Sequence, residues 1–334
     1  MVPALKELAQ FYEGFLTTAD MNGNYVFVPS ISPENVPAST DPSGPVLVNA
    51  TMDVAVCREV LTNLIQASEL LGETASISTW KDMLARMPPY LLEPDGTLKE
   101  WAWPTLQERY AHRHVSHLYG AWPGDEIDPD RTPQLARAAD IACRRRSFDV
   151  MATAVAGETL AAYGRCHRAL VGARLKDDIL VDVQLRHLLE QGYVSSSLRC
   201  SREPYGHPVP DAHGGIPAIV MEMLLYSRPG VIEVLPALPA SLTKGSIRGM
   251  LARTFARIDR LAWDMATRTV ELTVTSLRSQ DATLLARHGI EALTASETIL
   301  AAPLVSGMAD INVHLPEMRP VTFRMTLGHR ERTH

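Results

Sequence analysis

The stretch Thr51-Met-Asp-Val-Ala-Val-Cys-Arg-Glu-Val-Leu-Thr-Asn-Leu-Ile-Gln-Ala-Ser-Glu-Leu-Leu-Gly72 decides the fold class of the first part of the chain. Its apolar side chains recur every four residues, with two more beside them: Met52, Val56, Val60 and Leu64, with Leu61 and Ile65. This spacing puts the apolar groups on one face of an α-helix, and Gly72 is a typical stop signal. The pattern predicts an amphipathic helix that packs against other helices.

Helical patterns continue on both sides of this stretch. They predict helices near residues 3–18, 76–87, 149–163, 165–176, 179–190 and 216–227. Another helix is expected to begin at Thr132-Pro133, with Thr132 as the N-cap and Pro133 at the first helical position. Long loops rich in Pro, Gly, Trp and His separate these helices at 21–50 and 93–131, and loops of that length usually carry function.

The pattern changes from helix to strand after Arg228-Pro229-Gly230. Residues 269–275 alternate strictly between apolar and polar side chains, which is typical of a half-buried strand. Further strands are expected at 231–235 and near 246–258, 282–287, 311–315 and 320–327. We therefore predict a mainly α protein with two domains: a helical domain over 1–228 and a small β-sandwich-like domain over 229–334.

Composition limits the classes of protein to consider. The 334 residues are 46% hydrophobic and 21% charged, which fits a globular protein of about two domains. The net charge of -6 provides no basic field for nucleic acid or for an anionic membrane surface. No run of about 18 apolar residues predicts a membrane span, and residues 1–15 lack the pattern of a signal peptide. The four cysteines lie far apart in the chain, which favours reduced thiols over disulfides or a zinc site.

Two carboxyl groups stand out as a possible acid and base. Glu100 lies in a loop beside Trp101 and Trp103. A carboxyl group against indole rings is poorly solvated, which favours its protonated form, and the rings offer flat faces for a sugar. Asp211 lies in a Pro/Gly-rich turn before a helix, where backbone N–H groups favour the ionised form. An acid and a base of this kind suit inverting glycoside hydrolysis, although a solvated or capping role is the ordinary alternative for each.

Histidine and arginine side chains follow Glu100 in the segment His112-Arg-His-Val-Ser-His117. The spacing of its histidines is not that of a helical zinc site, so no metal is expected. Arg113 and His114 suit hydrogen bonds to sugar hydroxyls, because both present fixed N–H donors. His213 lies close to Asp211 and is a candidate substrate contact, with orientation of the loop as the alternative role. The run at 144–146 is expected to complement a helix dipole and to face water.

Three sequence segments together resemble glycoside hydrolase family 95, the inverting α-L-fucosidases and related α-L-galactosidases. Pro29-Ser-Ile-Ser-Pro-Glu-Asn35 resembles the family's Pro-Ser-x-Ser-Pro-Glu-Asn loop. Residues 112–124 resemble its His-Arg-His-x-Ser-His-Leu…Pro-Gly segment, and Leu235-Pro-Ala-Leu-Pro239 resembles the entry into its C-terminal β domain. The resemblance runs, with gaps, from about residue 24 to about residue 265.

The resemblance implies a fold and a set of roles. It implies an (α/α)6 toroid as the helical domain, Glu100 as general acid, Asp211 as general base, and Arg113 and His114 as substrate contacts, without a cofactor. The substrate would be a fucosylated or L-galactosylated glycan. Where many members have Asp-Gly-Asn-Phe-Gly, this chain has Asp211-Ala-His-Gly-Gly215, which leaves the choice of sugar open.

Family members are much longer than this chain. They carry an N-terminal β-sandwich, the first helices of the toroid, and asparagines that position the attacking water, and nothing in this sequence matches those parts. We therefore expect a partial (α/α)6 toroid whose exposed apolar helix faces favour self-association.

Three hypotheses follow from these residues. The first is an inverting α-L-fucosidase-like hydrolase. The second is an inactive C-terminal fragment of such an enzyme that at most binds sugar. The third is metal-dependent hydrolysis through the histidines, which predicts that a chelator abolishes activity.

Overall fold

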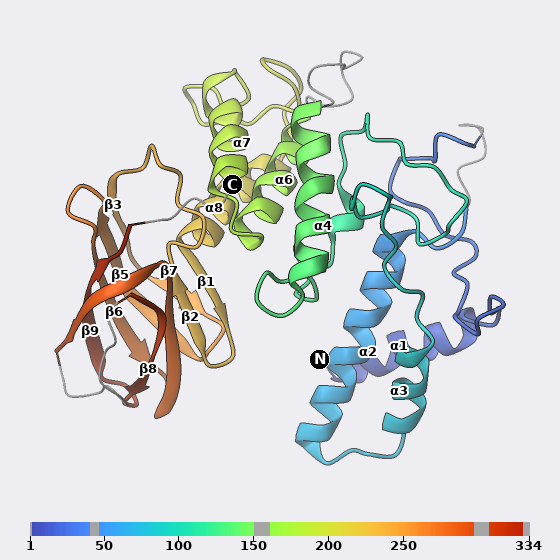
Figure 1. Cartoon of the computed structure of the whole chain (residues 1–334), viewed down its shortest axis with the longest axis horizontal. Helices are drawn as coiled ribbons and strands as arrows, with labels where there is room; N and C mark the ends of the chain where they lie inside the picture. Colours follow the sequence, from blue (N-terminus) through green and yellow to red (C-terminus); the bar gives the residue numbers. More distant parts are fainter. Residues whose placement is uncertain (1, 41–46, 150–160, 297–306, 330–334) are drawn as a thin grey trace. The chain divides into compact units, whose positions relative to one another are not determined.

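The computed structural model describes residues 2–40, 47–149, 161–296 and 307–329, and the chain forms two compact units (Figure 1). The first unit comprises Met1–Val171 and Gln191–Val209. The second comprises Gly172–Glu190 and Pro210–His334. The predicted domain boundary at about residue 229 follows the change from helix to strand and stays a prediction.

Three helices of the first unit pack around one apolar core: α1 (Val2–Phe15), α2 (Thr51–Leu71) and α3 (Ile77–Ala85). Leu61 and Leu64 of α2 are fully buried in this core beside Phe27 and Trp80. Gly72 ends α2 with a φ of 72°, a left-handed conformation that suits glycine. The helices predicted from the spacing of apolar residues in this region are confirmed to within a few residues.

The remaining helices of this unit among the described residues lie later in the chain. They are the 3₁₀ turn η1 (Ser116–Leu118), α4 (Pro133–Arg144), the π-helical turn η2 (Arg145–Asp149) and α6 (Ala162–Arg174), whose last turn belongs to the second unit. Pro133 is the first residue of α4, as expected, but the Thr132 hydroxyl does not cap the helix. It accepts a hydrogen bond from the Asp128 N–H of the preceding turn at 2.8 Å instead. Most of the helix predicted at 149–163 lies outside the described residues.

Two helices belong to the second unit, α7 (Asp178–Glu190) and α8 (Asp211–Leu224). The prediction for α8 was wrong at both ends. The helix begins five residues earlier than predicted, at Asp211, and it accommodates Pro217 in its interior. It ends before Leu225 because the next residues pair as a strand instead.

The strands of this unit form a single hydrogen-bonded sheet of nine strands. They are β1 (Leu225–Arg228), β2 (Val231–Val234), β3 (Lys244–Ile247), β4 (Met250–Ala252), β5 (Ala256–Asp264), β6 (Thr269–Ser276), β7 (Gln280–Ala295), β8 (Met308–Leu315) and β9 (Pro320–Leu327). The main order is β1-β2-β7-β9-β6-β5-β3, with β4 paired to β5 and β8 paired to β7. Apart from the β2–β7 pair, which is parallel, the pairs are antiparallel.

The described strands form one curled sheet, and the expectation of a β-sandwich-like domain stays a prediction. All nine strands belong to one curled sheet rather than to two separate sheets (Figure 1). The reason lies in β7, which pairs with β2, β8 and β9 along its 16 residues and changes register on the way. A long strand with such irregularities bends, and this lets the sheet curl without a break. The alternation in β6 is confirmed, since Val270, Leu272 and Val274 are all buried.

Two further expectations concern the whole sequence. Within the described ranges, no helix is both long and apolar enough to cross a membrane. The four cysteines are free and buried, as the sequence predicts.

Candidate active site

Glu100 is fully buried, and its carboxylate is held by polar groups from two separate segments. Its carboxylate accepts hydrogen bonds from the Ser32 hydroxyl and from the Asn35 side-chain amide, each at 2.5 Å. The guanidinium of Arg146 forms an ion pair with the same carboxylate, and this side chain is also fully buried. Burying a charge is costly unless it is paired and hydrogen-bonded, so the site is built to hold a carboxylate.

Arg146 corrects one expectation from the sequence. The run at 144–146 was expected to face water; the side chains of Arg144 and Arg145 are 39% and 34% exposed, but that of Arg146 is fully buried. Arg144 bonds Asp140 at 2.9 Å, Arg145 pairs with Asp95, and Arg146 pairs with Glu100. The π-helical turn that follows α4 begins within this run. Such turns are frequent at functional sites.

The loop at 29–35 reaches the site through three of its residues. Ser32 and Asn35 donate hydrogen bonds to the Glu100 carboxylate. Glu34 lies between them in sequence and points to other partners: it pairs with Arg113 and accepts a hydrogen bond from His114 Nε2 at 2.9 Å. The hydrogen bond from His114 and the positive charge of Arg113 hold the pKa of the Glu34 carboxyl below its usual value. The side chain of Glu34 is 60% exposed, so this edge of the cluster is open to solvent.

Two buried arginines hold the backbone of the His112–His114 segment through hydrogen bonds. Arg168 of α6 donates to the carbonyl oxygens of His112 and Arg113, at 3.1 and 3.3 Å. Arg146 donates to the carbonyl oxygen of His114. With its carbonyl groups fixed, the segment presents the side chains of Arg113 and His114 toward Glu34. The ring of His114 also stacks on Tyr163, with centroids 5.2 Å apart.

The other two histidines of the segment are buried. Burial lowers the pKa of His112 to about 3, and the nearby charge of Arg146 adds to this effect. Burial also lowers the pKa of His117 well below its usual value. Among the residues that the structure describes, no group of three His, Cys, Asp or Glu side chains is arranged to hold a metal ion.

The two tryptophans differ in exposure. Trp101 is fully buried, so its ring presents no open face to a sugar in this structure. Trp103 is half-buried. Their proposed role in stacking on a sugar ring stays a prediction.

Asp211 and His213 lie in the second unit, both exposed, in the first turn of α8. Asp211 is the first residue of the helix. Residues two apart on a helix do not face each other, so Asp211 and His213 point in different directions. Glu100 belongs to the first unit.

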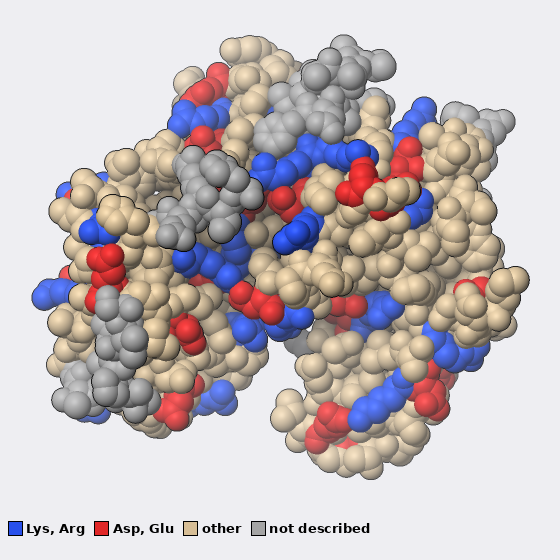
Figure 2. Space-filling model, in the orientation of Figure 1, with Lys and Arg blue, Asp and Glu red and all other residues tan. Residues whose placement is uncertain are grey.

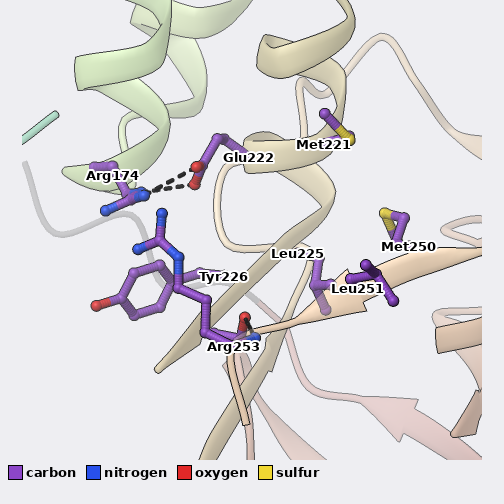
Figure 3. Close-up of a pocket in the computed structure, with 9 residues that line it drawn as sticks. Arg174, Met221, Glu222, Leu225, Tyr226, Met250, Leu251 and Arg253 are labelled. Carbon is purple, nitrogen blue, oxygen red and sulfur yellow. Dashed lines mark hydrogen bonds and ion pairs between the residues drawn. The ribbon is translucent and has the colours of Figure 1, made fainter. Parts of the chain in front are cut away.

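A cavity of about 210 Å³ lies in the second unit between α8 and the first strands (Figure 3). Arg174 closes one side by bonding Glu222 through two nitrogens, at 2.6 and 2.9 Å. Tyr226 and Arg253 lie beside this pair, and Met221 and Met250 lie on the apolar side (Figure 3). None of the predicted site residues lines this cavity.

The charged surface is mixed. On the face drawn in Figure 2, Lys and Arg side chains lie beside Asp and Glu side chains in several small groups. A surface of this kind creates no broad field of one sign on that face.

Four residues of the site were not predicted from the sequence: Ser32, Glu34, Asn35 and Arg146. The first three lie in the loop whose motif was noted, and the motif was the signal that could have found them. Arg146 carried no such signal, because an arginine at a helix end is ordinarily solvated.

Comparisons with known proteins agree with these motifs. A model described as the glycosyl hydrolase family 95 catalytic domain matches residues 1–224, and one described as the glycoside hydrolase family 95 C-terminal domain matches residues 226–312. The chain is 33% identical over 233 residues to alpha-L-fucosidase 2 of Arabidopsis thaliana, covering 67% of this chain and 27% of that protein. It is 28% identical over 282 residues to probable alpha-fucosidase A of Aspergillus oryzae, covering 75% and 36%.

A solved structure shares the fold. The α-L-rhamnosidase of Streptomyces avermitilis, in complex with L-rhamnose, aligns over 97% of this chain and 30% of its own, with a TM-score of 0.51 and 14% identity. At that identity, the likeness concerns the fold alone. The chain spans about a quarter to a third of the length of the curated relatives named above. Because the two family models match consecutive parts of the sequence, this chain belongs to glycoside hydrolase family 95.

Proposed function

We propose that this chain serves in the hydrolysis of terminal α-L-fucosyl, or α-L-galactosyl, residues of glycans by an inverting mechanism. In this proposal, the helical part is a portion of an (α/α)6 toroid, Glu100 is the general acid and Asp211 is the general base. It is supported by membership of the family and by the names of the two fucosidase relatives.

Glu100 would donate its proton to the glycosidic oxygen as the bond to the leaving group breaks. Proton donation leaves a carboxylate, and the partners of Glu100 suit that product. Ser32 and Asn35 donate hydrogen bonds to it, and Arg146 supplies a positive charge. These partners stabilise the carboxylate that remains once the proton has been transferred.

Asp211 would remove a proton from the water that attacks the anomeric carbon from the opposite face. Its exposed position at the start of α8 keeps it open to water. An inverting pair must leave room for that water, so the two carboxyl groups are expected about 6.5–9.5 Å apart in the working enzyme.

Arg113 and His114 would bind hydroxyl groups of the sugar. In the structure both already contact an acceptor, the Glu34 carboxylate, which shows that their donors converge on one point. A sugar hydroxyl bound there would share or replace that contact. Trp103 and His213 complete the proposed substrate contacts, and neither metal nor organic cofactor enters the proposal.

The single observation that carries the proposal is the convergence on Glu100. Residues from the 29–35 loop and from the turn after α4 meet at one buried carboxylate, and Arg146 also holds the backbone of the 112–117 segment. Two of these segments are the motifs that resemble the family.

The test measures release of L-fucose by the parent chain and by two variants. Glu100→Gln and Asp211→Asn should each lower the rate by roughly 10²- to 10⁴-fold, because each removes a proton-transferring group. Glu93→Gln and Asp310→Asn are matched controls that should retain the parental rate. The first product should be the β-anomer, read by proton NMR. A near-parental rate in either test variant would contradict the role given to that residue.

A second candidate is that this chain binds sugar without hydrolysing it. It is favoured by the share of the relatives that the chain spans, 27% and 36%. This candidate predicts saturable binding of L-fucose in a calorimetric titration, weakened in Arg113→Ala, with no L-fucose released from a fucosyl-glycan by the parent chain.

A further inference from the structure

The cavity between α8 and the first strands is lined by more positive than negative side chains. Its lining includes two arginines, Arg174 and Arg253, and one acid, Glu222. The Glu222 carboxylate already bonds Arg174, at 2.6 and 2.9 Å. Within the ranges that the structure describes, the Arg253 guanidinium forms no ion pair. The lining therefore carries one positive charge that no acidic side chain of the cavity balances.

Arg174 is held in one orientation by the protein itself. Its side chain is 3% exposed, and the double contact with Glu222 fixes the plane of the guanidinium. Its Cζ atom also lies 5.4 Å from the ring centroid of the buried Tyr226. A group that is ordered before a ligand arrives loses little conformational entropy on binding, which favours affinity.

The turn that carries Arg253 is fixed as well. The Arg253 N–H donates to the Ser227 hydroxyl at 2.8 Å. The next residue, Thr254, is fully buried, and its hydroxyl accepts a backbone N–H from the turn between β1 and β2 at 3.0 Å. From this anchored backbone, the Arg253 guanidinium points toward the Arg174–Glu222 pair (Figure 3). An unbalanced cation thus lies beside an ordered one.

The side of the cavity away from the arginines is apolar (Figure 3). Leu225 and Met250 line it as buried side chains. Met221 and Leu251 also line it, and they are 48% and 78% exposed. An apolar group that covered these two side chains would remove their surface from water, which is favourable.

Charge and size together define the ligand class. Arginine binds carboxylates and phosphates, both through two parallel N–H bonds. A surplus of one positive charge suits a monoanion, whereas a phosphate monoester carries about −1.5 to −2 and would be repelled by Glu222. The volume of about 210 Å³ lies below the roughly 300–1,000 Å³ of pockets for drug-sized ligands, so the apolar body must be small.

We propose that this cavity binds a small organic monocarboxylate with an apolar body. The carboxylate would bind Arg253 beside the ordered Arg174, and the body would pack against the methionine and leucine side chains. This inference does not depend on the proposed function, because no residue with a proposed catalytic or sugar-binding role lines the cavity.

The test uses 3-phenylpropanoate as the probe and the full chain with labelled methionine methyl groups. In methyl NMR, the signals of Met221 and Met250 should shift saturably as the probe is added. Met308 and Met318 do not line the cavity and should keep their positions. An absence of saturable shifts at Met221 and Met250 would overturn the proposal.

Three further ligands separate the contributions of charge and body. The alcohol 3-phenylpropan-1-ol keeps the body without the charge, and acetate keeps the charge without the body. Each should bind at least roughly 10-fold more weakly than 3-phenylpropanoate. Inorganic phosphate should also bind more weakly. Equal affinity for the alcohol would reduce the site to an apolar cavity, and tighter binding of phosphate would refute the choice of a monocarboxylate.

Arg253→Gln tests the residue that supplies the surplus charge. Arg253 is exposed, so the variant should fold, and its affinity for 3-phenylpropanoate should fall by roughly 10-fold or more. Arg248→Gln is the matched control: it makes the same change at an exposed arginine outside the cavity and should keep the parental affinity. An equal loss in both variants would assign the effect to net charge and would refute the site. The comparison of the probe with its alcohol in the parent chain decides the proposal even where Arg253→Gln does not fold.

Discussion

At the scale of single residues, each buried charge of this site is tolerated only while its partner is present. Glu100 and Arg146 are both fully buried, and removing one partner of such a pair leaves an uncompensated charge. The Glu100 loop was noted from the sequence, but the role of Arg146 was not, because a cation at a helix end ordinarily reaches solvent. What differs here is the approach of a carboxylate 46 residues away, which pairs with the guanidinium inside the protein.

His112 is expected to make the chain sensitive to acid. Its folded pKa of about 3 lies below the unfolded value of about 6.5, so the unfolded state binds a proton first as the pH falls. The stability associated with a neutral His112 is therefore complete above about pH 6.5 and is lost progressively toward pH 3. When the pH is lowered from 6.5 to 4, the unfolding free energy of His112→Gln should fall by about 3 kcal/mol less than that of the parent chain.

The measurement for His112 is urea unfolding of parent and variant at several pH values. His314→Gln, which removes a half-exposed histidine of β8, is the control and should keep the parental pH dependence. Equal slopes for the parent and His112→Gln would contradict the buried, neutral state of this histidine.

At the scale of elements, the 112–114 segment depends on close packing against α6. Arg168 reaches the carbonyl groups of this segment from α6, and Gly164 on the same helix lets the backbone approach. A Cβ atom at Gly164 would lie only 2.2 Å from the carbonyl oxygen of Arg113. Since backbone atoms cannot rotate away as side chains do, this contact constrains how near the helix can lie.

Gly164→Ala should therefore separate α6 from the segment that carries Arg113 and His114. We expect a loss of about 1–3 kcal/mol of unfolding free energy, as for other overpacked sites, together with weaker sugar binding. Gly214→Ala in α8 is the matched control, because a Cβ there meets nothing within 4 Å. Alanine favours a helix over glycine, so this control should be neutral or gain up to about 1 kcal/mol. A Gly164→Ala chain as stable as the control would contradict the close approach.

At the scale of the whole molecule, apolar side chains remain on the surface of α1. Leu8 is 45% exposed and Phe11 is 58% exposed, and the ring of Phe11 stacks on Phe15 with centroids 5.5 Å apart. Adjacent exposed apolar groups of this kind mark a surface that gains free energy by contact with another. The self-association predicted from the sequence would use this face.

The double change Leu8→Gln and Phe11→Gln should weaken that association. In sedimentation velocity, the parent chain is expected to shift to larger species as its concentration rises, because burying apolar surface is favourable. The variant should shift less. Met21→Gln removes an isolated and almost fully exposed apolar side chain and should behave as the parent does. A parent chain that stays a monomer at all concentrations would contradict the prediction.

The sequence by itself determined the helices of the first part, the β character of the last part and the family, because periodicity and short motifs act over a few neighbouring residues. Only the tertiary structure decided that Ser32, Asn35 and Arg146 meet at Glu100, across 68, 65 and 46 residues of chain. It also placed Leu225 in a strand rather than in a helix, since pairing with Val234 outweighed a local helical pattern. Contacts between distant residues depend on how whole elements pack, and the spacing of neighbouring residues in the sequence does not specify that packing.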